Sequence, residues 1–262
     1  MFFSLIQNNE QDILILLQLK RKVMINVIID HILKCVSGEY GLTANLVFDP
    51  INHIRLRPNV IYDIVENKKV LHLGCTDHSS IIEWKVKNGR YLHRQLTYIT
   101  QECLGVDINA AAAEQLKTYG IDNIIINDIT IPGIKEISEN SWDYLLMAEM
   151  LEHVDNPVDF LKSIIKAYGK NIDHVIITVP NAFGLVHLVN VIGKGLESVN
   201  YDHKYWFTPY TACKVIHESG LILEDLIMCL YENSTPVLKD NIEELKQKPI
   251  LLDTIVIIAR LP

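Results

Sequence analysis

The apolar residues of this chain fall into two alternating patterns from Val70 onward. Short runs rich in Val, Ile and Leu, bounded by turn-forming residues, alternate with longer segments in which apolar residues recur every three or four positions. The short runs are typical of buried β-strands and the longer segments of helices. The predicted strands span residues 70–73, 103–107, 123–127, 142–148, 174–180, 223–231 and 254–259.

Helical segments are predicted between these strands, for example over residues 110–119 and 158–168. Asn156 and Pro157 stand where the second of these helices begins, and Asn at an N-cap followed by Pro in the first turn is a common helix start. Regular alternation of strands and helices indicates crossover connections in a mostly parallel sheet. We therefore predict an α/β fold: a Rossmann-like, doubly wound sheet of seven mostly parallel strands with helices on both faces.

The N-terminal part of the chain has a different pattern. Apolar residues at helical spacing predict a helix over about residues 10–34, and residues 38–58 are polar and irregular. The apolar run at 13–19 is too short for a membrane span, and the basic cluster follows it, unlike in a signal peptide. The helix could dock on the domain, on a second copy in a homodimer, or on a membrane surface. We predict an extension at residues 1–57 and a domain at 58–262.

The composition of the chain limits the kinds of partner that it can bind. The 262 residues are 49% hydrophobic, enough for one sizeable core. The formal net charge is −8, so the chain has no excess of basic residues to neutralise phosphates, which argues against a nucleic-acid partner. The five cysteines are widely spaced and form no Cys-x-x-Cys pair, as expected for reduced thiols in a cytoplasmic protein.

Three predicted strand ends carry candidate chemistry. Gly74 follows the first strand, and a residue without a β-carbon lets the backbone approach a ligand closely. Asp107 ends the second strand, where a carboxylate can accept both hydroxyl protons of a ribose. Asp128 follows the third strand and could accept from an adenine amine, with Ile129 against the ring. Either aspartate alone could equally cap a turn, but the succession of the three predicts a nucleoside-binding crevice.

Several strings support one resemblance. Residues 71–75, 105–107 and 127–129 resemble the first three motifs of class I S-adenosylmethionine-dependent methyltransferases. The string Glu-Met-Leu-Glu-His-Val over residues 149–154, followed by Asn156-Pro157, is similar to a stretch of the methyltransferase type 11/12 group. The Asp-His-Lys-Tyr-Trp-Phe-Thr-Pro string at 202–209 resembles relatives that act in sugar or cell-surface biosynthesis.

The resemblance implies an S-adenosylmethionine-dependent methyltransferase that O-methylates a small or carrier-linked, sugar-like acceptor. It would place the cofactor's methionine part over the Gly74 loop, its ribose on Asp107 and its adenine near Asp128. Arg57 lies just ahead of the first strand, where it could reach a carboxylate, or could simply begin a helix. The cofactor-binding candidates are Arg57, His72, Gly74, Cys75, Asp107, Ile108, Asp128, Ile129 and Glu149.

The same resemblance implies an acceptor site above Glu149, His153 and His203, which are the catalytic candidates. Either imidazole could accept a hydroxyl proton, because histidine titrates near neutral pH, or could serve only in packing. Glu149, Glu152 and His153 also resemble a string of the ubiquinone-biosynthesis O-methyltransferases, which suggests a divalent cation that orients the acceptor. The string also occurs in relatives without an obvious metal, so no metal ligand is assigned.

Some residues depart from the motifs. His72 stands where an acid is usual, and Thr76 and His78 stand where further glycines are usual. The long segment 79–102 is predicted to form an extra helix or a lid. These departures keep open a protein that binds S-adenosylmethionine or S-adenosylhomocysteine without catalysis. A dinucleotide-dependent dehydrogenase would need a Gly-x-Gly-x-x-Gly turn, which is absent from the sequence.

Overall fold

The computed structural model describes residues 29–231 and 235–262, and the chain divides into two compact units, Met1–Leu46 and Val47–Pro262. In the first unit, residues 29–37 are helical, and the His31 ring donates to the carbonyl of Asn45. The rest of the helix predicted over 10–34 lies outside the described residues. The division at residue 57 stays a prediction. Of the helices that can be described, none is long and apolar enough to cross a membrane.

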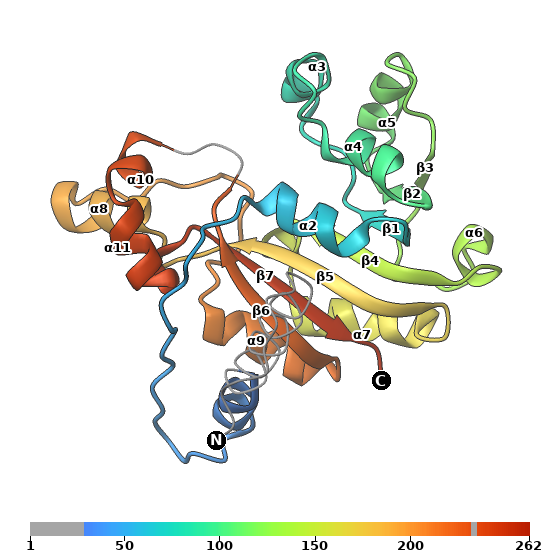
Figure 1. Cartoon of the computed structure of the whole chain (residues 1–262). Coiled ribbons are helices and arrows are strands. Elements are labelled where there is room, and N and C mark those ends of the chain that lie inside the picture. The colour runs from blue at the N-terminus through green and yellow to red at the C-terminus, as the bar shows by residue number, and fades with distance from the viewer. Residues whose placement is uncertain (1–28, 232–234) are drawn as a thin grey trace, which may run out of the picture. The chain divides into compact units, whose positions relative to one another are not determined.

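The second unit is built on one seven-stranded sheet in the order β3-β2-β1-β4-β5-β7-β6 (Figure 1). The first five of these strands are parallel, and β7 runs antiparallel to both of its neighbours. The predicted seven-stranded, mostly parallel sheet is therefore confirmed. The strands are β1 (Lys69–Leu73), β2 (Glu102–Asp107), β3 (Ile124–Ile126), β4 (Trp142–Ala148), β5 (Ile172–Pro180), β6 (Ile222–Cys229) and β7 (Thr254–Arg260).

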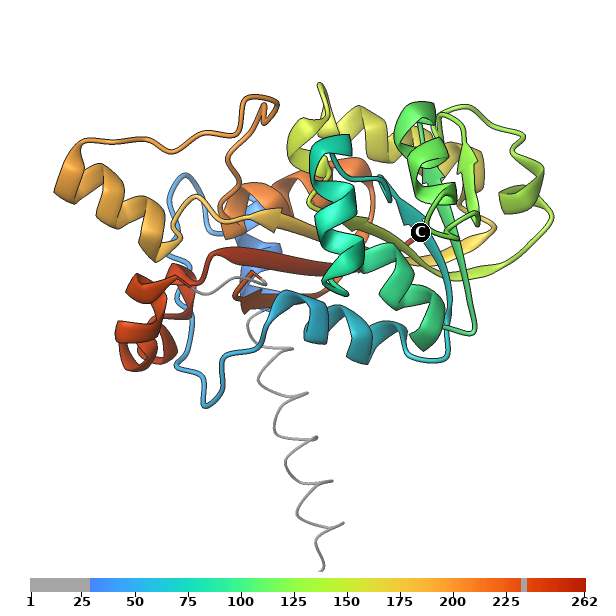
Figure 2. The same ribbon diagram turned by 90° about the horizontal axis from the view of Figure 1, so that it is seen from above.

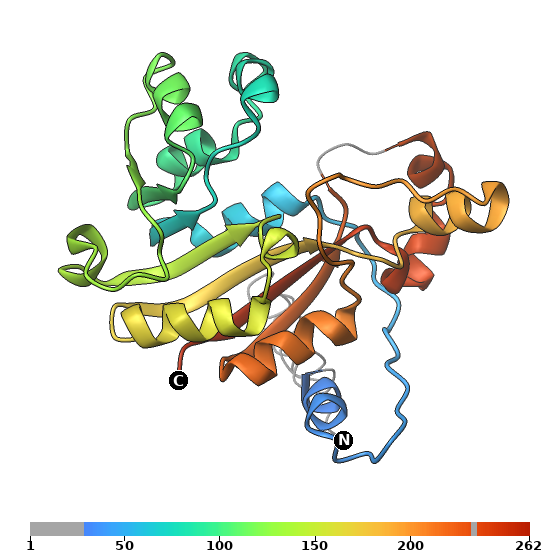
Figure 3. The ribbon, with the colours of Figure 1, turned by 180° about the vertical axis from the view of Figure 1, so that it is seen from behind.

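Helices cover both faces of this sheet. Helices α2 and α4 lie on one face, and α7 and α9 lie together on the other (Figures 2 and 3). The helices are α2 (Arg57–Val65), α3 (Ser79–Lys87), α4 (Leu92–Ile99), α5 (Ala110–Lys117), α6 (Lys135–Ser138), α7 (Pro157–Tyr168), α8 (Leu185–Lys194), α9 (Pro209–Ser219), α10 (Pro236–Asp240) and α11 (Ile242–Gln247), with short 3-10 turns η1 (Leu151–His153) and η2 (Pro249–Leu251).

The core explains why the strand runs are so uniformly apolar. In β5, five consecutive residues from Val175 to Val179 are buried, because each face of the strand meets a helical layer. Ile176 belongs to a cluster with Val60 of α2, Leu96 of α4 and Val256 of β7. Alternating polar positions are therefore missing from the central strands, as the sequence pattern indicated.

Local signals account for several element ends. The Asn156 side chain accepts from the backbone N–H of Asp159 at 3.2 Å, and Pro157 occupies the first turn of α7, so the predicted start is confirmed. The segment 79–102 forms α3 and α4, because the parallel neighbours β1 and β2 need a crossover between them. The strand predicted to Tyr231 ends at Cys229, since Leu230 pairs instead with residues just ahead of α2.

Candidate active site

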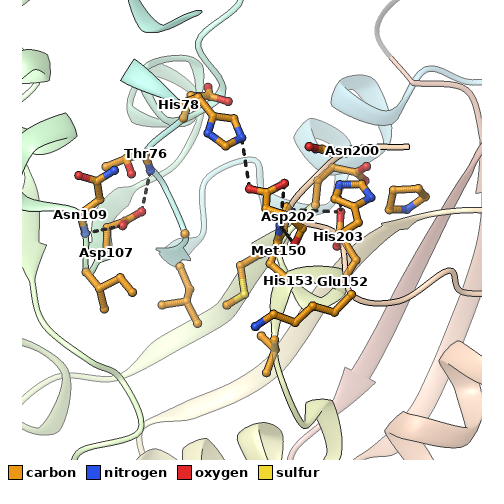
Figure 4. A pocket seen from close by; sticks show the side chains of 18 of the residues that line it. Thr76, His78, Asp107, Asn109, Met150, Glu152, His153, Asn200, Asp202 and His203 are labelled. Atoms are coloured by element: carbon orange, nitrogen blue, oxygen red, sulfur yellow. Dashed lines mark hydrogen bonds and ion pairs between the residues drawn. The ribbon is translucent and has the colours of Figure 1, made fainter. Parts of the chain in front are cut away.

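A cavity of about 1020 Å³ opens where β1, β2 and β4 end. The strand order turns back here, since β1 connects to β2 on one side and pairs with β4 on the other. Ligands of open α/β sheets bind at such a switch point, beyond the carboxyl ends of the strands. The opposite wall comes from the segment between α8 and α9 (Figure 4). The cavity is lined among others by Gly74, Asp107, Asp128, Glu149, His153 and His203.

Gly74 makes the turn that the sequence predicts. Its φ of +64° lies in the left-handed region, which residues with a side chain rarely adopt. A β-carbon at this position would also lie 2.8 Å from Cγ of Met150, closer than packed carbon atoms approach. Glycine is therefore needed both for the turn and for the packing of the Met150 side chain beside the cavity.

Asp107 ties two loops of the cavity together. One carboxylate oxygen accepts from the backbone N–H of Thr76 at 2.9 Å, and the other accepts from the N–H of Asn109 at 2.9 Å (Figure 4). A carboxylate oxygen has two lone pairs, so each oxygen keeps acceptor capacity after these bonds. The fixed position and the remaining capacity fit the two hydroxyl groups of a ribose.

The third strand end is a turn with an apolar neighbour. Asp128 accepts from the backbone N–H and the hydroxyl of Thr130, at 2.9 and 2.7 Å, which closes the turn after β3. Ile129 lines the cavity but is almost fully buried, whereas the side chain of Ile108 is 77% exposed beside it. Ile108 thus offers more apolar surface to a flat ring than Ile129 does. The adenine contact of Asp128 stays a prediction.

The buried Arg57 and the half-buried Glu149 form an ion pair just beyond the end of β4. The Arg57 guanidinium is 3.5 Å from Oε1 of Glu149 and lies 4.3 Å from the centre of the Tyr231 ring. Glu149 also accepts from the Thr178 hydroxyl at 2.8 Å. Its φ of +53° is uncommon for a residue with a side chain, and such strain concentrates at functional sites. Glu149 and Tyr231 line the cavity, and Arg57 contacts both.

His72 and Cys75 are placed elsewhere. Both are buried, and neither belongs to the lining of the cavity within the described chain. Nδ1 of His72 lies 3.2 Å from Nδ1 of His93, so one ring donates and the other accepts. Burial, and then the neighbouring His93, lowers the pKa of His72, and burial lowers the pKa of His93 to about 4. The roles of His72 and Cys75 in cofactor binding stay predictions.

The side of the cavity where the sequence predicts the acceptor contains a buried acid between two imidazoles. Glu152 is 0% exposed, and neither of its side-chain oxygens has a hydrogen-bond partner among the described residues. Its Oε1 is 3.8 Å from Nε2 of His203 and 4.0 Å from Nε2 of His153. Burial, and then the Glu149 carboxylate, raises the pKa of Glu152 to about 9, so it is protonated at neutral pH. Burial also lowers the pKa of His203.

The position of His153 defines its neutral form. Its Nδ1 is 3.2 Å from the backbone carbonyl oxygen of Asp202, and a carbonyl can only accept. The neutral ring therefore carries its proton on Nδ1, which leaves Nε2 free to accept one. Sequence reasoning assigned no role to Asp202, although it directly precedes His203 in the Asp-His string.

A cation could bind on the same side. One ligand atom each from Glu152, His153 and His203 lies within 4.8 Å of the others. This set differs from the Glu149, Glu152 and His153 string that the sequence indicated, because the loop before α9 brings His203 to the site. Two imidazoles and one carboxylate suit a borderline divalent ion.

Two curated proteins are similar to this chain. The ubiquinone biosynthesis O-methyltransferase of Aeromonas salmonicida is 28% identical over 170 residues, which cover 61% of this chain and 65% of that protein. The match thus spans less than two thirds of this relative. The enzyme of the same name from Acinetobacter baylyi is 24% identical over 195 residues, which cover 68% of this chain and 75% of that protein. No family model matches the chain.

Several solved structures are also similar to this chain. A SAM dependent methyltransferase from Aquifex aeolicus has a TM-score of 0.47 and 12% identity, with 79% of this chain and 90% of that one covered. One from Archaeoglobus fulgidus has a TM-score of 0.44 and 17% identity, with 78% and 94% covered. The sequence relatives agree with the motifs, and the sheet is the doubly wound one that they imply. The chain is thus similar in sequence to O-methyltransferases, and it has the sheet expected of a class I S-adenosylmethionine-dependent methyltransferase.

Proposed function

We propose that this protein transfers a methyl group from S-adenosylmethionine to an oxygen atom of a small or carrier-linked, sugar-like acceptor. The observation that carries the proposal is that a single cavity joins Gly74 and Asp107, at the ends of β1 and β2, to His153 and His203. The O-methyltransferase names of both sequence relatives support oxygen as the methylated atom. Trp206, which lines the cavity and packs edge-on against His187, could stack on a sugar ring.

The residues on the cofactor side would each bind a different part of the cofactor. S-adenosylmethionine, when bound, supplies a methyl group on a sulfonium for an in-line displacement. Asp107 would hold the ribose through the acceptor capacity that its two backbone contacts leave. Glu149 lines the cavity and offers a carboxylate for the ammonium of the methionine part, whereas His72 is buried outside the lining residues. Arg57, fixed against Glu149 and Tyr231, would act on the methionine part through these two cavity-lining residues.

On the acceptor side, His153 is the expected general base. Its free Nε2 would take the hydroxyl proton as the acceptor oxygen forms its bond to carbon, and the nearby Asp202 carboxylate would balance the positive ring. Protonated Glu152 would donate a hydrogen bond to the acceptor or to an imidazole. His203, with its lowered pKa, stays neutral and can orient the acceptor.

Two alternatives rest on specific observations. Thr76 and His78, in place of the usual glycines, favour a protein that binds the cofactor without catalysis. The cluster of Glu152, His153 and His203 favours a divalent cation that would orient the acceptor oxygens, provided that Glu152 gives up its proton on binding. The cytoplasmic location and the homodimer expected from the sequence also stay proposals.

Calorimetry separates these possibilities. S-adenosylmethionine and S-adenosylhomocysteine are titrated into the protein, first without and then with Mg²⁺ or Zn²⁺, followed by a mass-spectrometric screen for methylated sugars and phenols. Micromolar binding together with a methylated product would support the proposal. Binding without any product would favour the non-catalytic alternative, and no binding would contradict the proposed cofactor site. Heat from Zn²⁺ alone that His203→Ala removes would support the cation site.

A further inference from the structure

His78 connects the cofactor side of the cavity to the acceptor side. It lies in the loop after β1, directly ahead of α3, at a position where the class I motif that this loop resembles has glycine. Its Nε2 is 3.5 Å from Oδ2 of Asp202, which belongs to the segment between α8 and α9 (Figure 4). The His78 ring also packs against Tyr201, with 6.1 Å between the ring centres. Two loops that are far apart in the sequence therefore meet through side chains that glycine would not provide.

Asp202 makes a second contact with its other oxygen. Oδ1 is 3.5 Å from Nδ1 of His153, and the Asp202 backbone oxygen is 3.2 Å from the same nitrogen. This Oδ1 is buried and has no hydrogen bond within the described residues. A shift of a few tenths of an ångström would turn its contact with His153 into a hydrogen bond. Catalytic hydrogen bonds are often long in unliganded enzymes and shorten when ligands bind.

We propose that Asp202 is a positioning residue that couples the loop after β1 to His153. His78 of this loop would hold the Asp202 side chain in place. The inference rests on the proposed function and adds to it a route by which cofactor binding prepares the acceptor side. A cofactor over Gly74 would order the loop that carries His78. His78 then holds Asp202, and Asp202 fixes the ring and the tautomer of His153. The departure from glycine at position 78 thereby gains a function.

Titration with S-adenosylhomocysteine tests the coupling without knowledge of the acceptor. The affinity is measured for the wild type, His78→Ala, Asp202→Ala and the double variant. Partly exposed charge pairs contribute modestly, so each single substitution is expected to weaken binding about three- to fivefold. The double variant is expected to bind no more weakly than the weaker single variant, because both substitutions break the same contact. Asp202→Asn keeps the shape of the side chain and serves if Asp202→Ala is poorly folded.

Hydrogen exchange gives a second measurement that a purely structural role would not change. In the wild type, S-adenosylhomocysteine is expected to protect the amides of residues 198–204 as well as those of 74–78. In His78→Ala, protection of 74–78 should remain while that of 198–204 falls. Glu197→Ala is the matched control, since it removes an exposed carboxylate from the same segment and should change neither measurement.

Loss of the cofactor site and loss of the coupling give different results. If the wild type does not bind S-adenosylhomocysteine, the proposed function is contradicted. If the wild type binds it but both single variants bind equally well, with the same protection of residues 198–204, the coupling is overturned while the cofactor site stands. Additive losses in the double variant would also overturn the coupling, because they would mean that His78 and Asp202 act separately.

Discussion

Glu152 and His203 face each other across 3.8 Å in the interior of the cavity, and neither carboxyl oxygen of Glu152 is hydrogen-bonded within the described chain. An unpartnered buried carboxyl group is costly to ionise, which is why the pKa of Glu152 rises to about 9. The pair is thus a neutral acid beside a neutral imidazole at physiological pH. A proton accepted by His203 would leave a cationic ring, whose charge an ionised Glu152 could balance.

The first prediction concerns how stability depends on pH through Glu152. The carboxyl titrates near 4.5 in the unfolded chain and near 9 in the folded one, so the folded state holds an extra proton between these values. The free energy of unfolding therefore falls as pH rises through this window, by at most about 1.4 kcal/mol per pH unit from this group. Glu152→Gln should flatten the slope in urea unfolding at pH 6, 7 and 8. An unchanged slope would mean that Glu152 is ionised in the fold, and Glu136→Gln is the exposed control.

The second prediction concerns the ribose contact. Asp107→Ala should weaken S-adenosylhomocysteine binding about 10- to 100-fold in calorimetry, because hydrogen bonds to a charged carboxylate contribute about 1.5–3 kcal/mol. Asp122→Ala, which removes an exposed carboxylate near β3, should bind as the wild type does. Equal affinities of the Asp107 and Asp122 variants would refute the site. Asp107→Asn keeps one acceptor oxygen for the loop and should show an intermediate loss.

The third prediction separates backbone strain from crowding at Gly74. Gly120 has a similar φ of +72° but no atom within 4 Å of an added β-carbon, whereas Gly74 would meet Met150. Gly120→Ala should lower the free energy of unfolding by about 1 kcal/mol and Gly74→Ala by about 2–3 kcal/mol. Denaturant unfolding measures both. Similar losses at the two positions would show that the Met150 side chain simply moves away.

The fourth prediction concerns acid sensitivity from the His72 and His93 pair. The pKa of His93 is lowered from 6.5 to about 4, so the unfolded chain binds a proton that the folded chain does not bind between these values. This contribution to stability is complete above pH 6.5 and is lost as pH falls towards 4. Urea unfolding at pH 5 and 7 should therefore show a smaller difference for His93→Gln than for the wild type. His217→Gln, on the exposed side of α9, should keep the wild-type difference.

The fifth prediction addresses the general base. With the first acceptor that the screen identifies, His153→Asn should lower kcat about 10²- to 10⁴-fold, because it removes the free Nε2. The affinity for S-adenosylhomocysteine should stay within about twofold, since His153 lies on the acceptor side. His217→Asn provides the control for loss of an imidazole. A wild-type kcat in the His153 variant would assign proton transfer to another group.

The elements of the sheet could be predicted because their signals are local. Each strand is an apolar run with turn residues at its ends. Because the central strands are buried on both faces, their runs are not interrupted by alternating polar residues. The closeness of Gly74 and Asp107 could also be predicted, because the carboxyl ends of parallel strands meet at one edge of the sheet.

The side-chain partners could not be predicted in the same way. His72 pairs with His93, and His78 with Asp202, through loops and helices whose paths the apolar pattern does not determine. The partner of His72 in β1 is set by the position of α4, which carries His93. The sequence showed that His72 and His78 depart from the motif, but it did not show which side chains they contact.

The place of β7 between β5 and β6 has a consequence for biosynthesis. β7, at residues 254–260, follows the other six strands in the sequence, yet it is the sole described neighbour of β6. On the ribosome, β6 therefore has no strand to pair with until residues 254–260 have been translated. A premature stop before Thr254 would do more than remove one strand. It would leave two apolar strand edges unpaired, and such edges recruit other chains into aggregates.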